Sequence, residues 1–477
     1  MNFETVIGLE IHVQLGTASK AFCGDSTTFG AAPNTQISIV SLGYPGTLPY
    51  LNERVVECAV RLGCALQCTI NQASTFERKN YFYPDSPKGY QITQNENPIC
   101  IGGKLRFRVG DGAHEIRLHH IHIEEDAGKL IHDLAPDASC IDLNRAGVPL
   151  LEIVTEPDFR SSEQVVAFLT ELQKIVRFTG VSDGNMEEGA MRCDCNVSVR
   201  RVGAAEFGQR CEVKNVNSMR NARRAINYEA ARQIAIIENG GGIAQETRSF
   251  DAQNGTTSAL RSKEDAHDYR YFPEPDLPPV RLSEAYIDAI NKALPELPSA
   301  RFERYCHDLN LSAYEANLLS SDIDISAYFE AMLSHNLAAK TAANWLLNAV
   351  TAFLNANNIN IQNFGIQAIT LVELIKNVEN NTINKNIAES KLLPKLHQNQ
   401  RSTVAEWIVK LGLSQTKNDT DITTVLEAIL VKYPQKVAEY KKGKKGLSGF
   451  FLGEAMKITK GKMDAKAAAK VLDDLLL

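Results

Sequence analysis

The chain has 477 residues, of which 44% are hydrophobic and 23% are charged, and its formal net charge is −6. This balance is typical of a soluble globular protein, and the length predicts two to four domains. No apolar run approaches the roughly 20 residues that span a membrane, and no basic segment followed by an apolar run marks a signal peptide. We therefore expect a cytoplasmic protein.

Ten cysteines are scattered along the chain. Disulfide frameworks belong mainly to small proteins of oxidising compartments, and this long chain shows no secretory signal. We therefore expect reduced thiols. Cys193 and Cys195 alternate with polar residues, which predicts small buried side chains on a strand.

Residues 1 to about 280 predict a strand-rich unit, because short runs of alternating polarity are separated by clusters of Gly, Pro, Asn and Asp. Helices are expected near 50–66, 161–177 and 218–238. Ser218 is a suitable N-cap for the last of these, and the glycines at 240–242 predict its end. A proline-rich stretch at 272–279 closes this part, since proline suits neither a helix interior nor a central strand.

From about residue 299 the sequence changes to helical periodicity, rich in Ala, Leu, Asn, Lys and Glu. A further break near 396–402 precedes a lysine-rich end. We therefore predict an α+β protein of three units. The first, 1–294, is built on a largely antiparallel sheet; the second, 295–402, is all-α; the third, 403–477, is a small helical tail.

Four predicted strands of the first unit have a polar face that carries acids. In residues 8–15 (GLEIHVQL) the odd positions are apolar and the even positions polar, the pattern of a half-buried strand. The alternation recurs at 120–125, 193–199 and 211–215. The polar faces of the four strands carry Glu10, His12, His120, His122, Glu124, Asp194, Glu212 and Lys214.

These carboxylates predict a metal site if the four strands share one sheet, because clustered carboxylates repel one another unless cations compensate. Oxygen ligands with an occasional histidine suit Mg²⁺ or Mn²⁺ better than Zn²⁺, and Mg²⁺ so held also takes ATP phosphates. For any one strand a solvated acidic surface is the simpler interpretation, but four similar strands favour a site. The sequence contains no P-loop, no Gly-x-Gly-x-x-Gly and no Gly-x-Ser-x-Gly elbow. ATP would therefore have to bind on the sheet itself.

Seven segments together resemble a known family. They are GLEIHVQL (8–15), LGYPGTLP (42–49), ERKNYFYPD (77–85), DLNRAGVPLLE (142–152), MEEGAMRCD (186–194), EVKNVNS (212–218) and RSKEDAHDYRY (261–271). They are similar to the B subunits of bacterial aspartyl/glutamyl-tRNA(Asn/Gln) amidotransferases, the GatB/GatE family, and the resemblance covers the whole chain. It implies a cradle-shaped catalytic domain, a helical domain and a YqeY-like tail domain that binds tRNA; the match of the tail rests on residues 440–462.

The resemblance implies a ligase that uses glutamine as amido donor. ATP would phosphorylate the side-chain carboxylate of misacylated Glu-tRNA(Gln) or Asp-tRNA(Asn), and ammonia would then displace phosphate to give the amide. Such chemistry needs mainly positioning and charge stabilisation. Ammonia would come through an internal channel from a separate amidase (A) subunit, and a small C subunit would complete a heterotrimer. The sequence does not decide which of the two tRNAs is the product.

The resemblance also implies roles for individual residues. The catalytic set would be Glu10, His12, Glu125 and Lys79, although a surface lysine in an aromatic-rich loop is a competing interpretation of Lys79. ATP would contact Lys79, Lys214 and Asn215. The metal ligands would be Glu10, His12, Glu124, Glu125, Asp194 and Glu212. Phosphates of tRNA would meet Lys441, Lys442, Lys444 and Lys445, which a solvated helix surface explains equally well.

One departure from the family concerns zinc. Many members carry four cysteines near the start of the chain, and the corresponding positions here are Cys23, Asp25, Ser38 and Ser41. One thiolate of four does not make a structural Zn²⁺ site. We expect hydrophobic packing around Phe22, Phe29 and Leu42 in its place.

Two rival functions stay open at this point. The chain could be a tRNA-docking scaffold whose partner performs all the chemistry, in which case it would bind neither ATP nor Mg²⁺. It could also be a stand-alone ligase that uses free ammonia and needs no partner.

Overall fold

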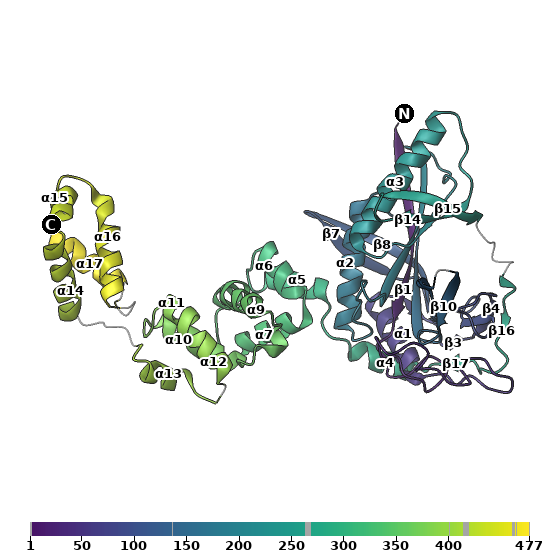
Figure 1. Cartoon of the computed structure of the whole chain (residues 1–477), viewed down its shortest axis with the longest axis horizontal. Coiled ribbons are helices and arrows are strands. Elements are labelled where there is room, and N and C mark those ends of the chain that lie inside the picture. The colour runs from purple at the N-terminus through teal and green to yellow at the C-terminus, as the bar shows by residue number, and fades with distance from the viewer. Residues whose placement is uncertain are drawn as a thin grey trace. The chain divides into compact units, whose positions relative to one another are not determined.

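The computed structural model describes residues 2–135, 137–262, 269–399, 401–413, 419–459, 463 and 465–476. The chain divides into two compact units, Met1–Arg301 and Phe302–Leu477. Strands dominate the first unit and helices make up the second, as Figure 1 shows, so the predicted α+β class is confirmed. No helix of the described residues is long and apolar enough to cross a membrane.

A large sheet organises the first unit. The order of its strands is β15-β14-β13-β12-β1-β11-β8-β6-β2, and β7 pairs with β8 off this path. All of its pairings are antiparallel except that of β13 with β14. The strands are β1 (Phe3–Gln14), β2 (Thr69–Ile70), β6 (Cys100–Ile101), β7 (Lys104–Val109), β8 (Gly112–Glu125), β11 (Pro149–Thr155), β12 (Met191–Arg201), β13 (Cys211–Lys214), β14 (Glu246–Asp251) and β15 (Thr256–Ser262).

Smaller sheets stand beside the large one. The proline-rich stretch contributes only the two-residue strand β16 (Phe272–Pro273), which pairs with β4 (Glu77–Asn80) at the edge of a three-stranded sheet, where a missing N–H is tolerated. The other strands are β5 (Tyr90–Thr93) beside β4, β3 (Ala73–Ser74) with β17 (Val280–Arg281), and β9 (Lys129–Ala135) with β10 (Ala138–Asp142).

Helices cover the apolar face of the large sheet. Side chains of α2 (Ser162–Phe178) and α3 (Met219–Glu238) share one hydrophobic core with the odd positions of β1. The side chain of Ser218 accepts a hydrogen bond from the N–H of Asn221, and Gly240 follows the helix at φ +80°, so the predicted start and end of α3 are confirmed. The predicted helix near 50–66 is α1 (Glu53–Ala65), and α4 (Glu284–Lys292) comes later in the chain.

The second unit is helical and contains two separate hydrophobic cores. One core draws on residues between Tyr305 and Leu413, and the other on residues between Ile422 and Leu476. Its α-helices are α5 (Pro298–His307), which crosses the unit boundary, α6 (Ala313–Ser320), α7 (Ile323–Ser334), α8 (Ala339–Asn344), α9 (Thr351–Asn357), α10 (Ala368–Glu379), α11 (Lys385–Ile387), α12 (Leu393–Gln398), α13 (Val404–Lys410), α14 (Asp419–Lys432), α15 (Pro434–Lys441), α16 (Ser448–Ile458) and α17 (Ala465–Leu476). The predicted boundaries at 294 and 402 stay predictions.

Candidate catalytic site on the polar face of the sheet

Three adjacent strands bring histidines and carboxylates into one row. In the register of β1, β11 and β8, His12 lies opposite Glu152, and Glu152 lies opposite His122. Residues in register on neighbouring strands project from the same face of a sheet. The odd positions of β1 fill the core, so this row lies on the opposite, polar face.

The tightest group in the row is His12, Glu124 and Glu152. One possible ligand atom from each residue lies within 4.8 Å of the others. His12 Nε2 is 3.2 Å from Glu152 Oε2, and His122 Nε2 is 3.5 Å from the same oxygen. Two buried carboxylates with an imidazole are a donor set that suits Mg²⁺ or Mn²⁺.

Among the described residues, the lining of the cavity in front of this group contains more acid than base. These lining residues include the four carboxylates of Glu10, Glu124, Glu152 and Glu212 and the two ammonium groups of Lys79 and Lys214. Lys214 Nζ forms ion pairs with Glu212 Oε1 at 2.9 Å and with Asp194 Oδ2 at 2.8 Å. Asp194 and Glu212 therefore share one lysine.

The pKa values in the group respond to this crowding. Burial alone would raise the pKa of both Glu124 and Glu152. The ammonium group of Lys79 outweighs burial and lowers the pKa of Glu124. The imidazoles of His122 and His12 do the same for the pKa of Glu152. Burial alone would lower the pKa of His12, and the Glu152 carboxylate raises it instead. Burial and the neighbouring imidazoles lower the pKa of His120 to about 4. The carboxylates are therefore ionised at neutral pH.

Lys79 projects from β4 into the same cavity. Its Nζ lies 3.4 Å from Glu124 Oε2 and 5.3 Å from the centre of the Tyr269 ring. Burial on its own would lower the pKa of Lys79, but the carboxylates of Glu124 and Glu152 raise it. Its side chain is only 20% exposed, so the interpretation as a surface lysine does not describe its position.

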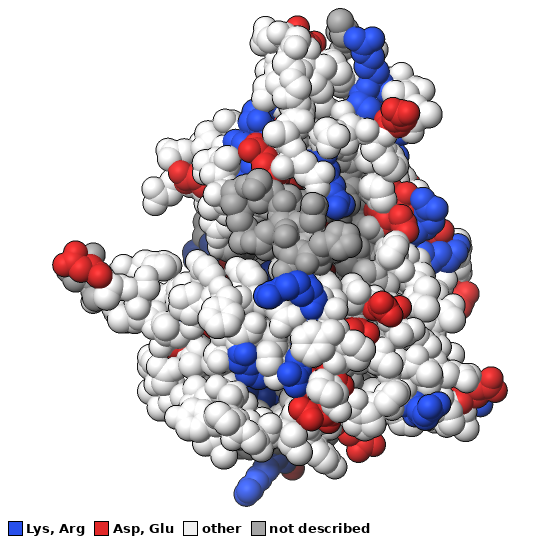
Figure 2. Space-filling view, turned by 90° about the vertical axis from the view of Figure 1, so that its right-hand side faces the viewer, with Lys and Arg blue, Asp and Glu red and all other residues white. Residues whose placement is uncertain are grey.

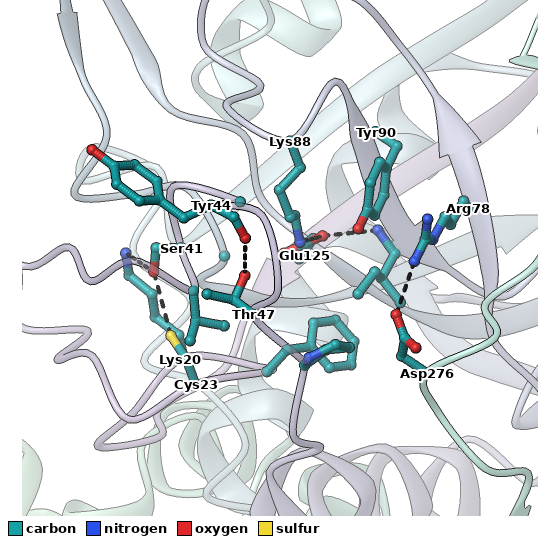
Figure 3. Close-up of a pocket in the computed structure, with 16 residues that line it drawn as sticks. Lys20, Cys23, Ser41, Tyr44, Thr47, Arg78, Lys88, Tyr90, Glu125 and Asp276 are labelled. Carbon is teal, nitrogen blue, oxygen red and sulfur yellow. Dashed lines mark hydrogen bonds and ion pairs between the residues drawn. The ribbon is translucent and has the colours of Figure 1, made fainter.

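Glu125 does not join the group around His12. Successive residues of a strand project from opposite faces, and Glu125 lies in a different cavity, drawn in Figure 3. There its carboxylate accepts hydrogen bonds from Lys88 Nζ and, at 2.8 Å, from the backbone N–H of Ile92. The partners of the Glu125 carboxylate are thus the ammonium group of Lys88 and the backbone N–H of Ile92. The predicted metal and catalytic roles of Glu125 stay predictions.

The four positions of the family's zinc site form a hydrogen-bonded network. Ser41 Oγ lies 3.3 Å from Cys23 Sγ and donates to Asp25, which also accepts from the backbone N–H of Ser38 at 2.9 Å. Lys20 is fully buried beside them, with Nζ 3.4 Å from Ser41 Oγ. Figure 3 draws this contact as a dashed line. The loop is thus held partly by polar contacts around a buried ammonium group.

The predicted packing in this loop is only partly right. Phe22 is buried and Leu42 is half-buried, but Phe29 is 69% exposed. The expectation that Phe29 packs in place of zinc was wrong, because the hydrogen-bonded network, and not an apolar cluster around that ring, joins the two halves of the loop.

Asn215 lies outside the lining of the acidic cavity. It follows β13 with φ +67°, a left-handed conformation that asparagine tolerates. Its side-chain N–H donates to the carbonyl oxygen of Phe250 at 3.1 Å. Asn215 therefore ties β13 to β14, and its predicted contact with ATP stays a prediction.

The lysines of the predicted tRNA-binding set are all exposed in the second unit. Lys441 ends α15, and Lys442, Lys444 and Lys445 follow it. Lys444 Nζ pairs with Glu439 at 3.1 Å, and Lys445 Nζ lies 4.3 Å from the centre of the Tyr440 ring. Neither contact withdraws these ammonium groups from solvent.

Glu152 is the residue that the sequence prediction missed. It lies in the run PLLEIVT (149–155), which is almost continuously apolar and has no clear alternation. A strand buried on both faces has that pattern. One acid inside such a run was the available signal, because a buried carboxylate without a partner is costly.

Comparison with known proteins identifies the family of the chain. The family model of the GatB/GatE catalytic domain matches residues 5–288, and that of the GatB domain matches residues 327–476. Proteins named as B subunits of aspartyl/glutamyl-tRNA(Asn/Gln) amidotransferases are similar over the full length. That of Geotalea daltonii is 48% identical over 100% of this chain and 99% of its own, and that of Thermodesulfovibrio yellowstonii is 46% identical over 100% of both. The chain belongs to the GatB/GatE family.

Proposed function

We propose that this chain is the subunit of a tRNA-dependent amidotransferase that activates a carboxylate carried by tRNA. ATP phosphorylates the side-chain carboxylate of misacylated Glu-tRNA(Gln) or Asp-tRNA(Asn), and ammonia displaces the phosphate to give the amide. The single observation that carries the proposal is the group of His12, Glu124 and Glu152 in an acidic cavity. The names of the full-length relatives support it.

The donor set suits a divalent cation bound together with nucleotide phosphates. Mg²⁺ commonly takes one or two protein carboxylates and fills its other positions with water and phosphate oxygens. The residues that would hold it are His12, Glu124 and Glu152, with Glu10 on the same face of β1. When bound, the ion would neutralise charge on the transferring phosphoryl group.

The other residues of the cavity position and balance charge. Lys79 keeps its proton, because its carboxylate neighbours raise its pKa, and it can contact a phosphate or an acyl phosphate oxygen. Thr93 Oγ1 donates to Glu124 Oε2 at 3.0 Å and Gln91 Nε2 donates to Glu124 Oε1 at 3.2 Å. These two contacts hold the Glu124 carboxylate in one orientation.

Ammonia has to come from another polypeptide. The sequence contains no amidase-type Gly-Gly-Ser-Ser segment, and the names of the relatives describe one member of a multi-subunit amidotransferase. We infer an amidase (A) subunit that releases ammonia from glutamine, an internal channel that keeps water away from the acyl phosphate, and a small C subunit in a heterotrimer. ATP and aminoacylated tRNA are cytoplasmic molecules, so the proposal implies that the chain works there.

The tail lysines are the proposed tRNA contact. On the face of the first unit drawn in Figure 2, basic and acidic side chains are interspersed without a broad patch of one sign. Lys441, Lys442, Lys444 and Lys445, by contrast, are four exposed cations within five residues. Such a cluster suits the phosphates of a duplex whose shape, and not its sequence, is recognised.

A pair of isosteric substitutions tests the catalytic assignment. In the assembled complex, Glu124→Gln and Glu152→Gln should each lower ATP-dependent formation of amidated tRNA by about a hundredfold or more, as removal of a group that stabilises transition-state charge does. Hydrolysis of glutamine should continue. The assay separates amidated from misacylated amino acid after deacylation of the tRNA, with Mg²⁺ saturating.

Glu115→Gln is the matched control, because Glu115 lies on the same strand β8 but is exposed and paired with Arg106 at 2.7 Å. Its amidation rate should equal that of the wild type. Amidation at the wild-type rate in both cavity variants would reject the proposed site. Amidation from ammonium salt without any partner would instead favour the stand-alone ligase, and absence of MgATP binding by the chain would favour the docking scaffold.

A second experiment tests the tail. Replacing Lys441, Lys442, Lys444 and Lys445 with Ala should weaken tRNA binding and reduce the slope of log K against log[salt], since fewer phosphate counterions are released. The amidation rate at saturating tRNA should not change. Unaltered affinity and slope would show that these lysines are only a solvated surface.

A further inference from the structure

Gln94 is a neutral polar residue in the lining of the acidic cavity. It follows β5 directly and is only 2% exposed. The residue before it, Thr93, donates to the carboxylate of Glu124 at 3.0 Å. The amide of Gln94 is therefore buried beside the group to which the proposed reaction is assigned, and each of its polar atoms needs a partner there.

The sheet holds the oxygen of this amide. The pairing of β6 with β8 ends at Cys100, which lies opposite Ile121. Beyond that point Gln94 Oε1 accepts hydrogen bonds from the backbone N–H of Ile123 at 3.1 Å and from that of Ile99 at 3.2 Å. Both groups can only donate, so the atom that meets them must be the oxygen and not the nitrogen. The orientation of the amide is therefore fixed.

The nitrogen of the amide is the atom without a partner. Gln94 Nε2 is buried and makes no hydrogen bond within the part of the chain that the structure describes. A rotation that exchanged the two atoms would not help, because it would turn the N–H groups of Gln94 toward those of Ile99 and Ile123. Nε2 is thus ready to donate to an acceptor that enters the cavity, which a water or a substrate atom can supply.

We propose that Gln94 Nε2 donates to the carbonyl oxygen of the acyl phosphate and stabilises the negative charge that gathers there when ammonia attacks. The inference rests on the proposed function and assigns a residue to its second step. In this step the ammonia nitrogen bonds to the acyl carbon, and the electron pair of the C=O bond moves to the oxygen. When that pair returns, the bond from the acyl carbon to the phosphate oxygen breaks. Phosphate leaves with the proton that the nitrogen gives up, and the amide remains.

The charges in the cavity favour this acceptor over a phosphate oxygen. Phosphate oxygens are fully charged before the reaction, so they suit a divalent cation and the ammonium group of Lys79. The carbonyl oxygen becomes anionic only during the attack, and a donor that is already oriented stabilises such developing charge without reorganising. The ionised carboxylates of Glu124 and Glu152 cannot donate to it. A fixed neutral donor beside them therefore gives most to the transition state.

Two substitutions share the loss of this donor and differ in what else they change. Gln94→Glu keeps an oxygen for Ile99 and Ile123, but the ionised carboxylate has no N–H to donate. Gln94→Met adds no charge, and it has about the length of glutamine without either polar atom. The matched control is Asn97→Asp, the same exchange of amide for carboxylate in the same loop, because Asn97 is exposed and its Nδ2 donates to Thr75 Oγ1 at 3.2 Å.

The assembled complex is assayed in single turnovers of two half-reactions at pH 8. Without a nitrogen donor, tRNA-dependent release of ADP measures the phosphorylation of the carboxylate. With ammonium chloride in place of glutamine, amidated tRNA measures the attack on the acyl phosphate without any glutaminase step. Gln94→Glu and Gln94→Met should each slow amide formation by about a hundredfold or more, as removal of one oxyanion donor does, while release of ADP keeps its wild-type rate. Asn97→Asp should change neither rate.

The outcomes separate the inference from the function on which it rests. Amide formation at the wild-type rate in both variants would overturn the inference and would leave a buried water as the partner of Nε2. Slowing in only one variant would assign the effect to the added charge or to the lost oxygen, and would overturn it as well. So would an equal loss of both half-reactions, because Gln94 would then support the shape of the cavity and not one step. A wild-type complex without tRNA-dependent release of ADP would refute the proposed function itself.

Discussion

The first unit contains two buried acidic groups that look alike in composition and differ in what surrounds them. One is the row of His12, Glu124 and Glu152 on the polar face of the sheet. The other centres on Glu229 of α3, whose side chain is wholly buried between the helix and strands β14 and β15. In both groups burial alone would raise the pKa of the carboxylates, and their partners lower it instead.

Glu229 belongs to a closed network. Its oxygens accept hydrogen bonds from Arg232 at 2.6 Å, Gln233 at 2.9 Å and Thr257 at 2.9 Å, and Arg248 lies 3.3 Å away. Glu246 pairs with the same two arginines. Two carboxylates therefore meet two guanidinium groups, and no charge is left over.

The group around Glu152 is open. Among the described residues, the lining of the cavity that it borders has two more carboxylates than lysines, and Glu152 itself pairs with the imidazoles of His12 and His122. The comparison teaches that burial and a shifted pKa do not by themselves mark a functional site. Surplus charge beside a cavity does, because it is the surplus that a ligand has to neutralise.

The largest expected effect comes from breaking the closed network. Glu229→Ala should lower the free energy of unfolding of the first unit by about 3–5 kcal/mol, because Arg232 and Arg248, which are largely shielded from solvent, are left to share the single carboxylate of Glu246. Urea unfolding followed by circular dichroism measures the change. Glu152→Gln should cost less in the absence of metal, because it removes one charge from a surplus. Equal losses in the two variants would contradict the comparison.

The second largest expected effect is stabilisation by a divalent cation, which should bind the group around Glu152 and not the network around Glu229. Mg²⁺ or Mn²⁺ at about one hundred times its dissociation constant stabilises a protein that binds it only when folded by about 2.7 kcal/mol. Adding the ion should therefore raise the melting temperature of the wild type and of Glu115→Gln, but not that of Glu152→Gln. An equal rise in Glu152→Gln would place the cation elsewhere.

The smallest effect is a pH dependence of the closed network. The folded-state pKa of Glu229 is lowered, chiefly by hydrogen bonds from Arg232, Gln233 and Thr257 against the opposing effect of burial. Its contribution to stability is therefore complete above the unfolded glutamate pKa of about 4.3 and is lost as the pH falls from there through the folded pKa. The difference in unfolding free energy between wild type and Glu229→Gln should shrink between pH 6 and pH 3. A difference that grew over this range would show that Glu229 is not ionised in the folded state.

Much of the fold could be predicted from local patterns. The alternation in GLEIHVQL predicted a half-buried strand, and β1 covers Phe3–Gln14 with Leu9, Ile11 and Val13 in the core. The cap at Ser218 predicted the start of α3. Each of these features depends on residues within a few positions of one another, so the chain carries the information locally. The metal-site prediction required that the four acid-bearing strands share one sheet, and β1, β8, β12 and β13 do.

The composition of the site was decided by tertiary structure. The sequence alone determined that Glu10, His12 and Glu124 lie on polar faces and that no standard nucleotide loop is present. It could not pair His12 with Glu152, because that contact depends on the register of β1 with β11, formed by residues about 140 positions apart. Nor could it show that Asp194 and Glu212 share one lysine. A side chain's face follows from the period of its own strand, whereas its neighbours follow from which strands pair and in which register, and long-range packing determines both.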